Sequence, residues 1–183
     1  KGERVELVGG VRVADFKSFK DKILQRDCSD LNLPAAPQQL FLDGAREVLA
    51  RWPNKGEGEL PGGGWAFVAG QVEAEKNRSF KYNGDGPEKA ANVAGVEISI
   101  WPNYNWWQTI APVQAIDAAT KTIHLKDDIS YSIEVGRRYF LQNALEFLDA
   151  PGEWFHDRKA NLLYFYPPAG TDLAKATVEI VRL

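Results

Sequence analysis

The chain has 183 residues, of which 44% are hydrophobic and 26% are charged, as is typical of a globular protein with a sizeable core. Its net charge of −3 gives no electrostatic basis for binding nucleic acid or an anionic membrane. No run of about 18 apolar residues is present, which excludes a membrane-spanning helix. A single cysteine, Cys28, excludes an internal disulfide.

Three early segments predict different local structures. Residues 15–25 predict a helix, because their apolar side chains follow helical spacing: Phe16, Phe19, Ile23 and Leu24. In "QQLFLDGAREVLARWP", two apolar runs flank Asp43-Gly44 and predict a β-hairpin, since this dipeptide readily adopts the positive φ angles of a two-residue turn. The glycine-rich residues 54–65 predict a long surface loop without the glycine spacing of a phosphate-binding motif.

Strand patterns dominate the middle of the chain. "GVEISI" alternates, which places Val96, Ile98 and Ile100 on one face. "VQAIDAATKTIHL" predicts two strands around a turn at residues 117–120, and "RRYFLQNA" predicts a further strand. In the second strand of "VQAIDAATKTIHL" we expect Ile123 and Leu125 to be buried.

The C-terminal third continues this pattern. Residues 144–148 predict one helical turn, and "EWFHDRKANLLYFYPP" predicts two strands around residues 158–161 that end at Pro167-Pro168. "ATVEIVRL" at residues 176–183 reads as a last strand. Short strands at this spacing predict an all-β fold, either a β-sandwich or a barrel-like antiparallel domain with one or two short helices.

We expect residues 1–183 to form a single β-rich domain that is excised from, or inserted in, a larger protein. The chain has no methionine, even at position 1, and the last predicted strand runs to its end without a turn or polar tail.

Catalytic motifs are scarce. The two histidines, His124 and His156, lie in separate predicted hairpins, and one cysteine does not complete a zinc site with them. His124 falls on the polar side of its strand, so we expect it to be exposed and inert. Neither GxSxG nor HExxH occurs, and Asp127-Asp128 alone falls short of a calcium site. We predict no metal and no cofactor.

Four carboxylates are candidates for a glycosidase pair, which requires a separation of about 5–10 Å. They are Asp85, Asp149, Glu153 and Asp157. A self-contained glycosidase would place two of them across an open cleft. The competing interpretation makes Asp85 in "YNGDGP" a turn residue, and makes Asp149 the end of the short helix before Pro151.

The segment "IWPNYNWWQTI" concentrates four aromatic residues at 100–110. Strand parity places Trp101 on the non-core side, and Pro102 ends the ladder. Adjacent Trp106 and Trp107 cannot both face one core in an extended chain, because neighbouring side chains point to opposite sides. At least one tryptophan is therefore expected to be exposed or covered by a partner.

Indole faces stack on the C–H face of a sugar ring, and the amides of Asn103, Asn105 and Gln108 are suited to sugar hydroxyls. This combination favours a neutral or mildly charged glycan. The predicted carbohydrate-binding residues are Trp101, Tyr104, Asn105, Trp106, Trp107 and Gln108. The alternative is that the tryptophans seal an interface to another part of a larger protein.

Three segments in order carry a family resemblance: "QLFLDGAREVLARWPN", "FKYNGDGPEKAANVAGVEISIWPNYNWWQTIAPVQAIDAATKTIHL" and "GRRYFLQNALEFLDAPGEWFHDRKANLLYFYPP". They resemble the accessory β-domain of bacterial right-handed parallel β-helix proteins, which are mostly secreted glycoside hydrolases and polysaccharide lyase-like enzymes. The resemblance spans residues 39–168. In such proteins the accessory domain interrupts the first coils of the β-helix, which carries the catalytic carboxylates.

The matched positions are Asp43, Gly44, 50–54, 105–107, Arg138, Tyr139, Asn143, 148–154, Leu163, Tyr164 and Pro167. Two departures from the family pattern lie near Asp85. Related sequences carry Gly-Asp-Arg-Pro and then an arginine and a tryptophan, where this chain has Gly86 and then Lys89-Ala90. A guanidinium and an indole are therefore missing there.

The resemblance implies a non-catalytic domain of a secreted or periplasmic bacterial enzyme that degrades polysaccharide. Its partners would be a polysaccharide or oligosaccharide and the β-helix catalytic domain of the same chain, with no nucleic acid and no membrane. We therefore predict a carbohydrate-binding accessory domain. The alternative is a structural insert that flanks the active-site groove of a β-helix glycoside hydrolase or lyase and has no glycan affinity of its own.

The candidates for that groove or interface are Arg51, Trp52, Asn54, Glu153 and Trp154. Arg51 and Arg138 carry fork-shaped donors suited to pinning a loop through Asp149 or Glu153.

Overall fold

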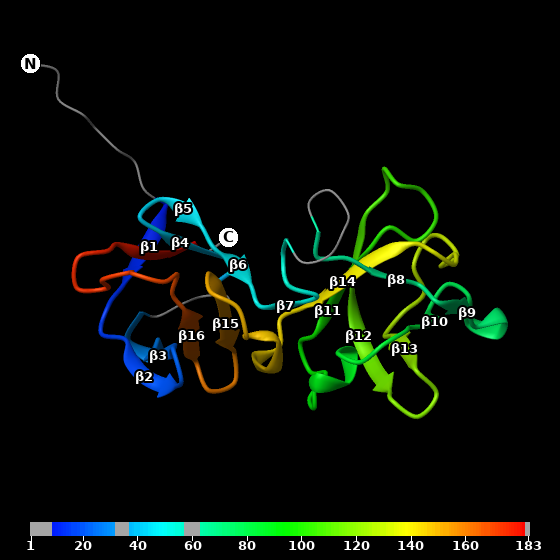
Figure 1. The fold of residues 1–183 in the computed structure, drawn as a ribbon, viewed down its shortest axis with the longest axis horizontal. Coiled ribbons are helices and arrows are strands. Elements are labelled where there is room, and N and C mark those ends of the chain that lie inside the picture. Colours follow the sequence, from blue (N-terminus) through cyan, green and yellow to red (C-terminus); the bar gives the residue numbers. More distant parts are fainter. Residues whose placement is uncertain (1–8, 32–36, 57–62, 182–183) are drawn as a thin grey trace, which may run out of the picture. The chain divides into compact units, whose positions relative to one another are not determined.

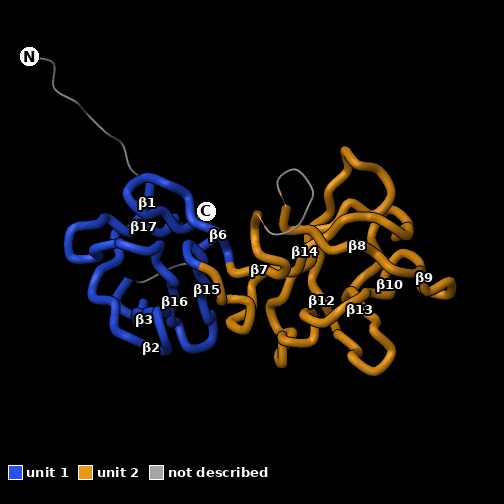
Figure 2. The backbone as a smooth tube through the Cα atoms, in the orientation of Figure 1, with its two compact units in different colours: residues 1–49, 151–183 blue, residues 50–150 orange. Residues whose placement is uncertain are grey.

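A computed structural model describes residues 9–31, 37–56 and 63–181 (Figure 1). The chain divides into two compact units (Figure 2): unit 1 comprises residues 1–49 and 151–183, and unit 2 comprises residues 50–150. Compact units are defined by contacts and not by independent folding, so the single β-rich domain stays a prediction. The all-β fold class is confirmed, and in the described part of the chain the helices are short 3-10 turns.

Unit 1 contains two sheets. Its elements are β1 Gly10–Val13, β2 Lys17–Lys20, β3 Ile23–Asp27, η1 Ser29–Leu31, β4 Gln39–Leu42, β5 Ala45–Arg46, β6 Val48–Leu49, β15 Glu153–Asp157, β16 Leu162–Tyr166 and β17 Val178–Val181. One sheet has the order β1-β17-β4-β5 and the other β2-β3-β16-β15-β6. All pairs in these sheets are antiparallel except β6 with β15. The core takes Leu40 and Ile180 from the first sheet and Trp154 and Phe165 from the second, as in a β-sandwich.

Unit 2 contains one eight-stranded sheet with the order β7-β14-β11-β12-β13-β10-β9, in which β8 also pairs with β14. Its elements are β7 Arg51–Trp52, β8 Ala66–Phe67, β9 Gly70–Gln71, η2 Glu73–Glu75, β10 Ser79–Lys81, η3 Pro87–Lys89, β11 Glu97–Ile100, β12 Thr109–Asp117, β13 Thr122–Leu125, β14 Arg138–Gln142 and η4 Leu145–Phe147.

Residues 66–71 close this sheet into a barrel. The N–H of Val68 donates to the Arg137 carbonyl at 2.9 Å, and the N–H of Ala69 donates to the Lys81 carbonyl at 2.8 Å. One short segment therefore bonds both to the β14 side and to β10. Because an alternating strand sends every second side chain inward, β14 buries Tyr139 and Leu141 and turns Arg138, Phe140 and Gln142 to the opposite face.

The predicted hairpins are confirmed. Asp43 and Gly44 have φ angles of 49° and 81° between the antiparallel strands β4 and β5. The carboxylate of Asp117 accepts the N–H of Ala119 at 2.9 Å and fixes the turn between β12 and β13. Strands β11, β14 and β17, the β15–β16 pair and the helical turn η4 also form where the pattern places them. Of the predicted loop 54–65, residues 57–62 lie outside the described residues.

The predicted helix over residues 15–25 is wrong. This segment forms β2 and β3, joined by a turn in which Asp21 has a φ of 52°. Strand β3 pairs with β16, which lies far along the chain, and the ring of Phe19 packs edge-on against Tyr164 at 4.8 Å. Four apolar residues in a short segment suit either helix or strand, and the pairing with β16 decides between them.

His156 is expected to make the stability of unit 1 depend on pH. Its side chain is buried in β15, with Nε2 at 3.1 Å from Asn161 Oδ1. Burial lowers the pKa of His156 below its ordinary value of 6.5. As pH falls through 6.5, the histidine of the unfolded chain becomes protonated, whereas His156 of the folded protein becomes protonated only at lower pH. The free energy of unfolding therefore falls as the pH is lowered.

Thermal unfolding at pH 8 and pH 5.5 tests this prediction. His156→Gln should lose less stability between the two pH values than the unchanged protein. Equal losses in the two proteins would contradict the prediction.

Candidate functional site

Residues 101–108 form the loop between β11 and β12 in unit 2 (Figure 1). The N–H of Trp101 still donates to the Arg138 carbonyl at 3.1 Å, which continues the ladder by one bond. Pro102 has no N–H to donate, so the ladder ends there. The N–H of Trp107 donates to the Tyr104 carbonyl at 3.2 Å and closes a turn. The predicted loop after β11 is therefore confirmed.

Four aromatic side chains in this region form what we call the aromatic cluster: Tyr104, Trp106, Trp107 and Tyr131. Tyr104 and Trp106 stack with ring centroids 5.3 Å apart, and Trp106 meets Trp107 edge-on at 5.9 Å. Tyr131 meets Trp107 at 5.5 Å and Tyr104 at 5.4 Å, so the ring contacts make a closed circuit. Trp106 is nevertheless 72% exposed. The prediction of an exposed tryptophan is confirmed.

Polar contacts fix the loop to its surroundings. The amide of Gln108 donates to the Ser99 hydroxyl at 2.6 Å. Asn105 accepts two bonds from guanidinium groups: its backbone oxygen from Arg138 Nη2 at 3.3 Å, and its side-chain oxygen from Arg137 Nη1 at 3.5 Å. Both amide residues are exposed and lie beside aromatic cluster residues in the chain.

Trp101 makes its ring contacts elsewhere, in an arginine–aromatic stack of Arg51, Trp65, Trp101, Arg138 and Phe140. The Arg138 guanidinium lies 4.5 Å from the Trp101 ring centroid and 5.1 Å from that of Trp65. The Arg51 guanidinium lies 3.6 Å from the Phe140 centroid. Such cation–π contacts stabilise a charge on an aromatic face. Trp101 is half-buried in this stack.

The predicted groove or interface residues divide between the two units. In unit 2, Arg51 is buried and its Nε donates to the Pro53 carbonyl at 2.9 Å. Asn54 donates to the Asp149 carboxylate at 2.9 Å, and the half-buried Trp52 lies against Gly86. These contacts hold the 51–54 segment in unit 2.

Glu153 and Trp154 belong to unit 1 and are 2% and 1% exposed. Trp154 has the largest of the fully buried side chains and packs in the core of unit 1. Its role is therefore to hold the sandwich together.

The candidate carboxylates of unit 2 form ion pairs at the surface. Asp85 is 94% exposed and lies 3.0 Å from Lys121, and Asp149 lies 3.4 Å from Lys89. Lys121 also binds Glu88. Burial alone would raise the pKa of Glu88, but the hydrogen bonds from Lys121 and from backbone N–H groups outweigh it and lower the pKa to about 2. Glu88 is therefore ionised at neutral pH and unsuited to donate a proton.

In unit 1, the carboxylate of Asp157 accepts the N–H groups of Lys159 at 2.8 Å and Ala160 at 3.0 Å. These bonds give Asp157 a structural role, because they fix the turn between β15 and β16.

A serine, a histidine and a carboxylate meet in unit 2. Ser79 Oγ lies 2.8 Å from His124 Nδ1 and donates to the Glu75 carboxylate at 2.5 Å. The expectation that His124 is exposed is wrong, because its side chain is only 34% exposed and is hydrogen-bonded. Ser79 is fully buried, so its hydroxyl does not face a substrate. The group therefore links β10 to β13.

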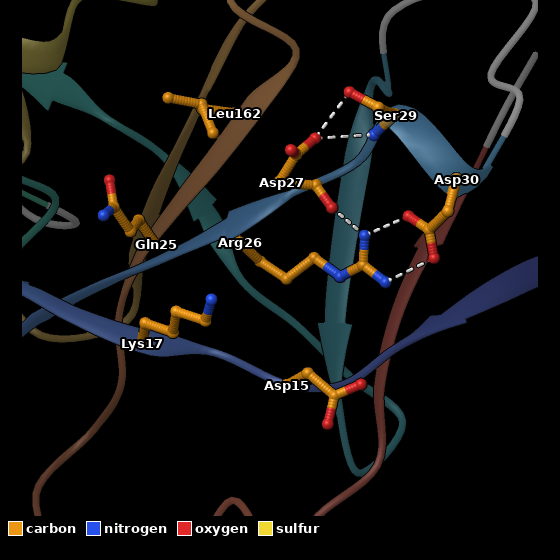
Figure 3. Close-up of a pocket in the computed structure, with 8 residues that line it drawn as sticks. All are labelled: Asp15, Lys17, Gln25, Arg26, Asp27, Ser29, Asp30 and Leu162. Atoms are coloured by element: carbon orange, nitrogen blue, oxygen red, sulfur yellow. Dashed lines mark hydrogen bonds and ion pairs between the residues drawn. The ribbon is translucent and has the colours of Figure 1, made fainter.

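A cavity of about 430 Å³ opens in unit 1 (Figure 3), lined by Asp15, Lys17, Gln25, Arg26, Asp27, Ser29, Asp30 and Leu162. Several of its polar groups bind one another. The Arg26 guanidinium donates to both carboxylate oxygens of Asp30 and to the Asp27 carbonyl. The Asp27 carboxylate accepts the Ser29 hydroxyl at 2.5 Å. A ligand would have to displace these bonds, so the aromatic cluster remains the stronger candidate site.

Within the described residues, no group of three or more His, Cys, Asp or Glu side chains is arranged to hold a metal ion. The same part of the chain contains no helix with the length and apolar character needed to cross a membrane.

Two comparisons with known proteins relate this chain to glycoside hydrolases. The family model of the GH141 insertion domain matches residues 129–168, which include Tyr131, Arg137 and Arg138. A solved structure described as a glycoside hydrolase matches with a TM-score of 0.70 and 18% identity, over 96% of this chain and 31% of that chain. No curated protein matches.

The chain thus has the fold of a segment that spans about a third of that glycoside hydrolase. Together the two matches support an accessory role in a glycoside hydrolase.

Proposed function

We propose that this chain is a non-catalytic, carbohydrate-binding accessory domain of a secreted bacterial glycoside hydrolase that degrades polysaccharide. The aromatic cluster carries the proposal. Trp106 is 72% exposed, and Tyr104 and Trp107 are 44% and 39% exposed. Burying an aromatic side chain would stabilise the protein, and an exposed ring does not supply that free energy. The exposure of three neighbouring rings therefore favours a function that needs them at the surface.

The cluster is also preorganised. Its four rings contact one another in a closed circuit, so binding orders few additional side chains and costs little conformational entropy. An aromatic face carries partial negative charge and attracts the C–H groups on one face of a pyranose. The amides of Asn105 and Gln108 stand beside the rings and are suited to sugar hydroxyls.

The comparisons support the accessory role, and the rest of the proposal extends them. An insertion domain implies a catalytic domain in the same chain, and the matched glycoside hydrolase is long enough to contain one. The right-handed parallel β-helix of that catalytic domain stays a prediction from the sequence resemblance.

The experiment is a binding screen of the chain against plant, algal and host polysaccharides by calorimetry and affinity electrophoresis. We expect the double substitution Trp106→Ala/Trp107→Ala to weaken binding at least tenfold, because two stacking surfaces are lost. The control is Phe19→Ala, which removes a ring that is 43% exposed in unit 1. Equal weakening by both variants, or none by the double variant, would contradict the site assignment.

The description of the matching family model as an insertion domain favours a second candidate function, a structural insert beside the active-site groove. An insert without glycan affinity predicts no binding in the screen from a well-folded sample. It also predicts that Trp106 fluorescence shifts to shorter wavelength when the chain is part of its larger protein, because a partner then buries the ring.

A further inference from the structure

Two guanidinium groups adjoin the aromatic cluster through Asn105, which lies between Tyr104 and Trp106 in the chain. Arg137 reaches the side-chain oxygen of Asn105, and Arg138 reaches its backbone oxygen. Both arginines come from the segment that starts β14, and both are half-buried. The aromatic surface therefore has a cationic border.

Neither guanidinium is neutralised within the part of the chain that the structure describes. Other basic side chains there form ion pairs, such as Arg26 with Asp30 and Lys121 with Glu88, but Arg137 and Arg138 form none. The carboxylate of Glu134, three residues before Arg137, accepts the Ser132 hydroxyl at 2.6 Å instead. Half-buried charge without a counter-ion is costly.

Arg138 also has an unused donor. Its Nε is buried and has no hydrogen-bond partner among the described residues. The ring faces of Trp65 and Trp101 stabilise the plane of the guanidinium, but they offer no oxygen to the N–H groups at its edge. Arginine forks match carboxylates well, because two N–H groups can meet two oxygens.

From these observations we propose that the aromatic cluster binds an anionic glycan, with uronate carboxylates held by Arg137 and Arg138 while a sugar ring stacks on Trp106. This inference rests on the proposed carbohydrate-binding function and specifies its ligand class. It replaces the sequence-based expectation of a neutral or mildly charged glycan. The reason is that the two arginines are separated in sequence from the aromatic loop and reach Asn105 only in the fold.

The test compares two polymers with the same backbone, polygalacturonate and its carboxyl-reduced, neutral form. We expect the chain to bind the acid form at least tenfold more tightly, which is the contribution of about one charge-assisted hydrogen-bonded pair. Arg137→Gln should remove most of this preference, because it should weaken binding of the acid form far more than binding of the neutral form. Arg46→Gln, a change at an exposed arginine of unit 1, should leave the preference intact.

The variants separate two kinds of failure. Trp106→Ala/Trp107→Ala should weaken binding to both polymers, because it removes the stacking surface and not the charge. Equal affinity for the two polymers, or a preference for a sulfated glycan that survives carboxyl reduction, would overturn the uronate proposal and leave carbohydrate binding standing. Absence of binding to every glycan would overturn both proposals.

Discussion

Replacing Trp154 with alanine is expected to destabilise the protein by about 3–5 kcal/mol, because it leaves a large cavity in a closed core. Trp154 is 1% exposed and has the largest of the fully buried side chains. It pairs with Phe165 of β16 on one side and with Leu49 of the edge strand β6 on the other. Urea denaturation should show the loss, together with a melting temperature lower by about 10 °C.

Two further variants show whether the cost comes from the core. Trp154→Phe retains an aromatic ring, and the buried Trp154 Nε1 has no hydrogen-bond partner among the described residues to lose. It should therefore cost less than alanine. Trp106→Ala removes the same atoms from a side chain that is 72% exposed and should change stability by less than about 0.5 kcal/mol. Similar effects of the two tryptophan-to-alanine substitutions would contradict the structure of unit 1.

Local turn chemistry made much of the fold predictable. Asp43-Gly44 has the positive φ angles that its hairpin requires, and the side chain of Asp117 fixes the next predicted turn. Long-range pairing was not predictable in the same way. Strand β17 lies between β1 and β4, and β6 runs parallel to β15. These neighbours are far apart in the chain and share no local pattern, so only the assembled sheets bring them together.

In the candidate site, too, local features were predictable from the sequence and long-range contacts were not. Strand parity and Pro102 correctly predicted that the ladder ends after Trp101 and that a tryptophan is exposed, because both act within a few residues. Tyr131 and Arg137 were missed, since they follow β13 and reach the loop only when β14 pairs with β11. Trp101 was grouped with the other aromatic residues by proximity in sequence, yet its ring contacts are with the arginine–aromatic stack.

Replacing Gly86 with alanine is expected to cost about 2–5 kcal/mol, because backbone strain and a steric clash act together at this position. Gly86 has a φ of 148°, which favours glycine. A Cβ placed there would lie 2.2 Å from Nε1 of Trp52 and 2.3 Å from its Cε2. The indole of Trp52 belongs to β7, which pairs with β14, so the ring has little freedom to retreat.

The matched control is Gly84→Ala, two residues earlier. Gly84 also has a positive φ, of 74°, but a Cβ there would have no neighbour within 4 Å. This variant should therefore lose only about 1–2 kcal/mol of stability, which comes from backbone strain. Combining Gly86→Ala with Trp52→Leu should cost less than the sum of the two single changes, because the smaller side chain relieves the clash. Equal losses for the two glycine variants would contradict the packing of Trp52 on Gly86.

This packing bears on the pattern that the sequence resemblance implies at the same point. That pattern has arginine after Gly-Asp where this chain carries Gly86, and the space that a side chain would enter is filled by the ring of Trp52. A larger residue at position 86 therefore requires a different position for that indole. If Gly86→Arg destabilises the protein and Gly86→Arg/Trp52→Leu restores most of the loss, the two positions are coupled, and the edge beside Asp85 is shaped by packing in unit 2.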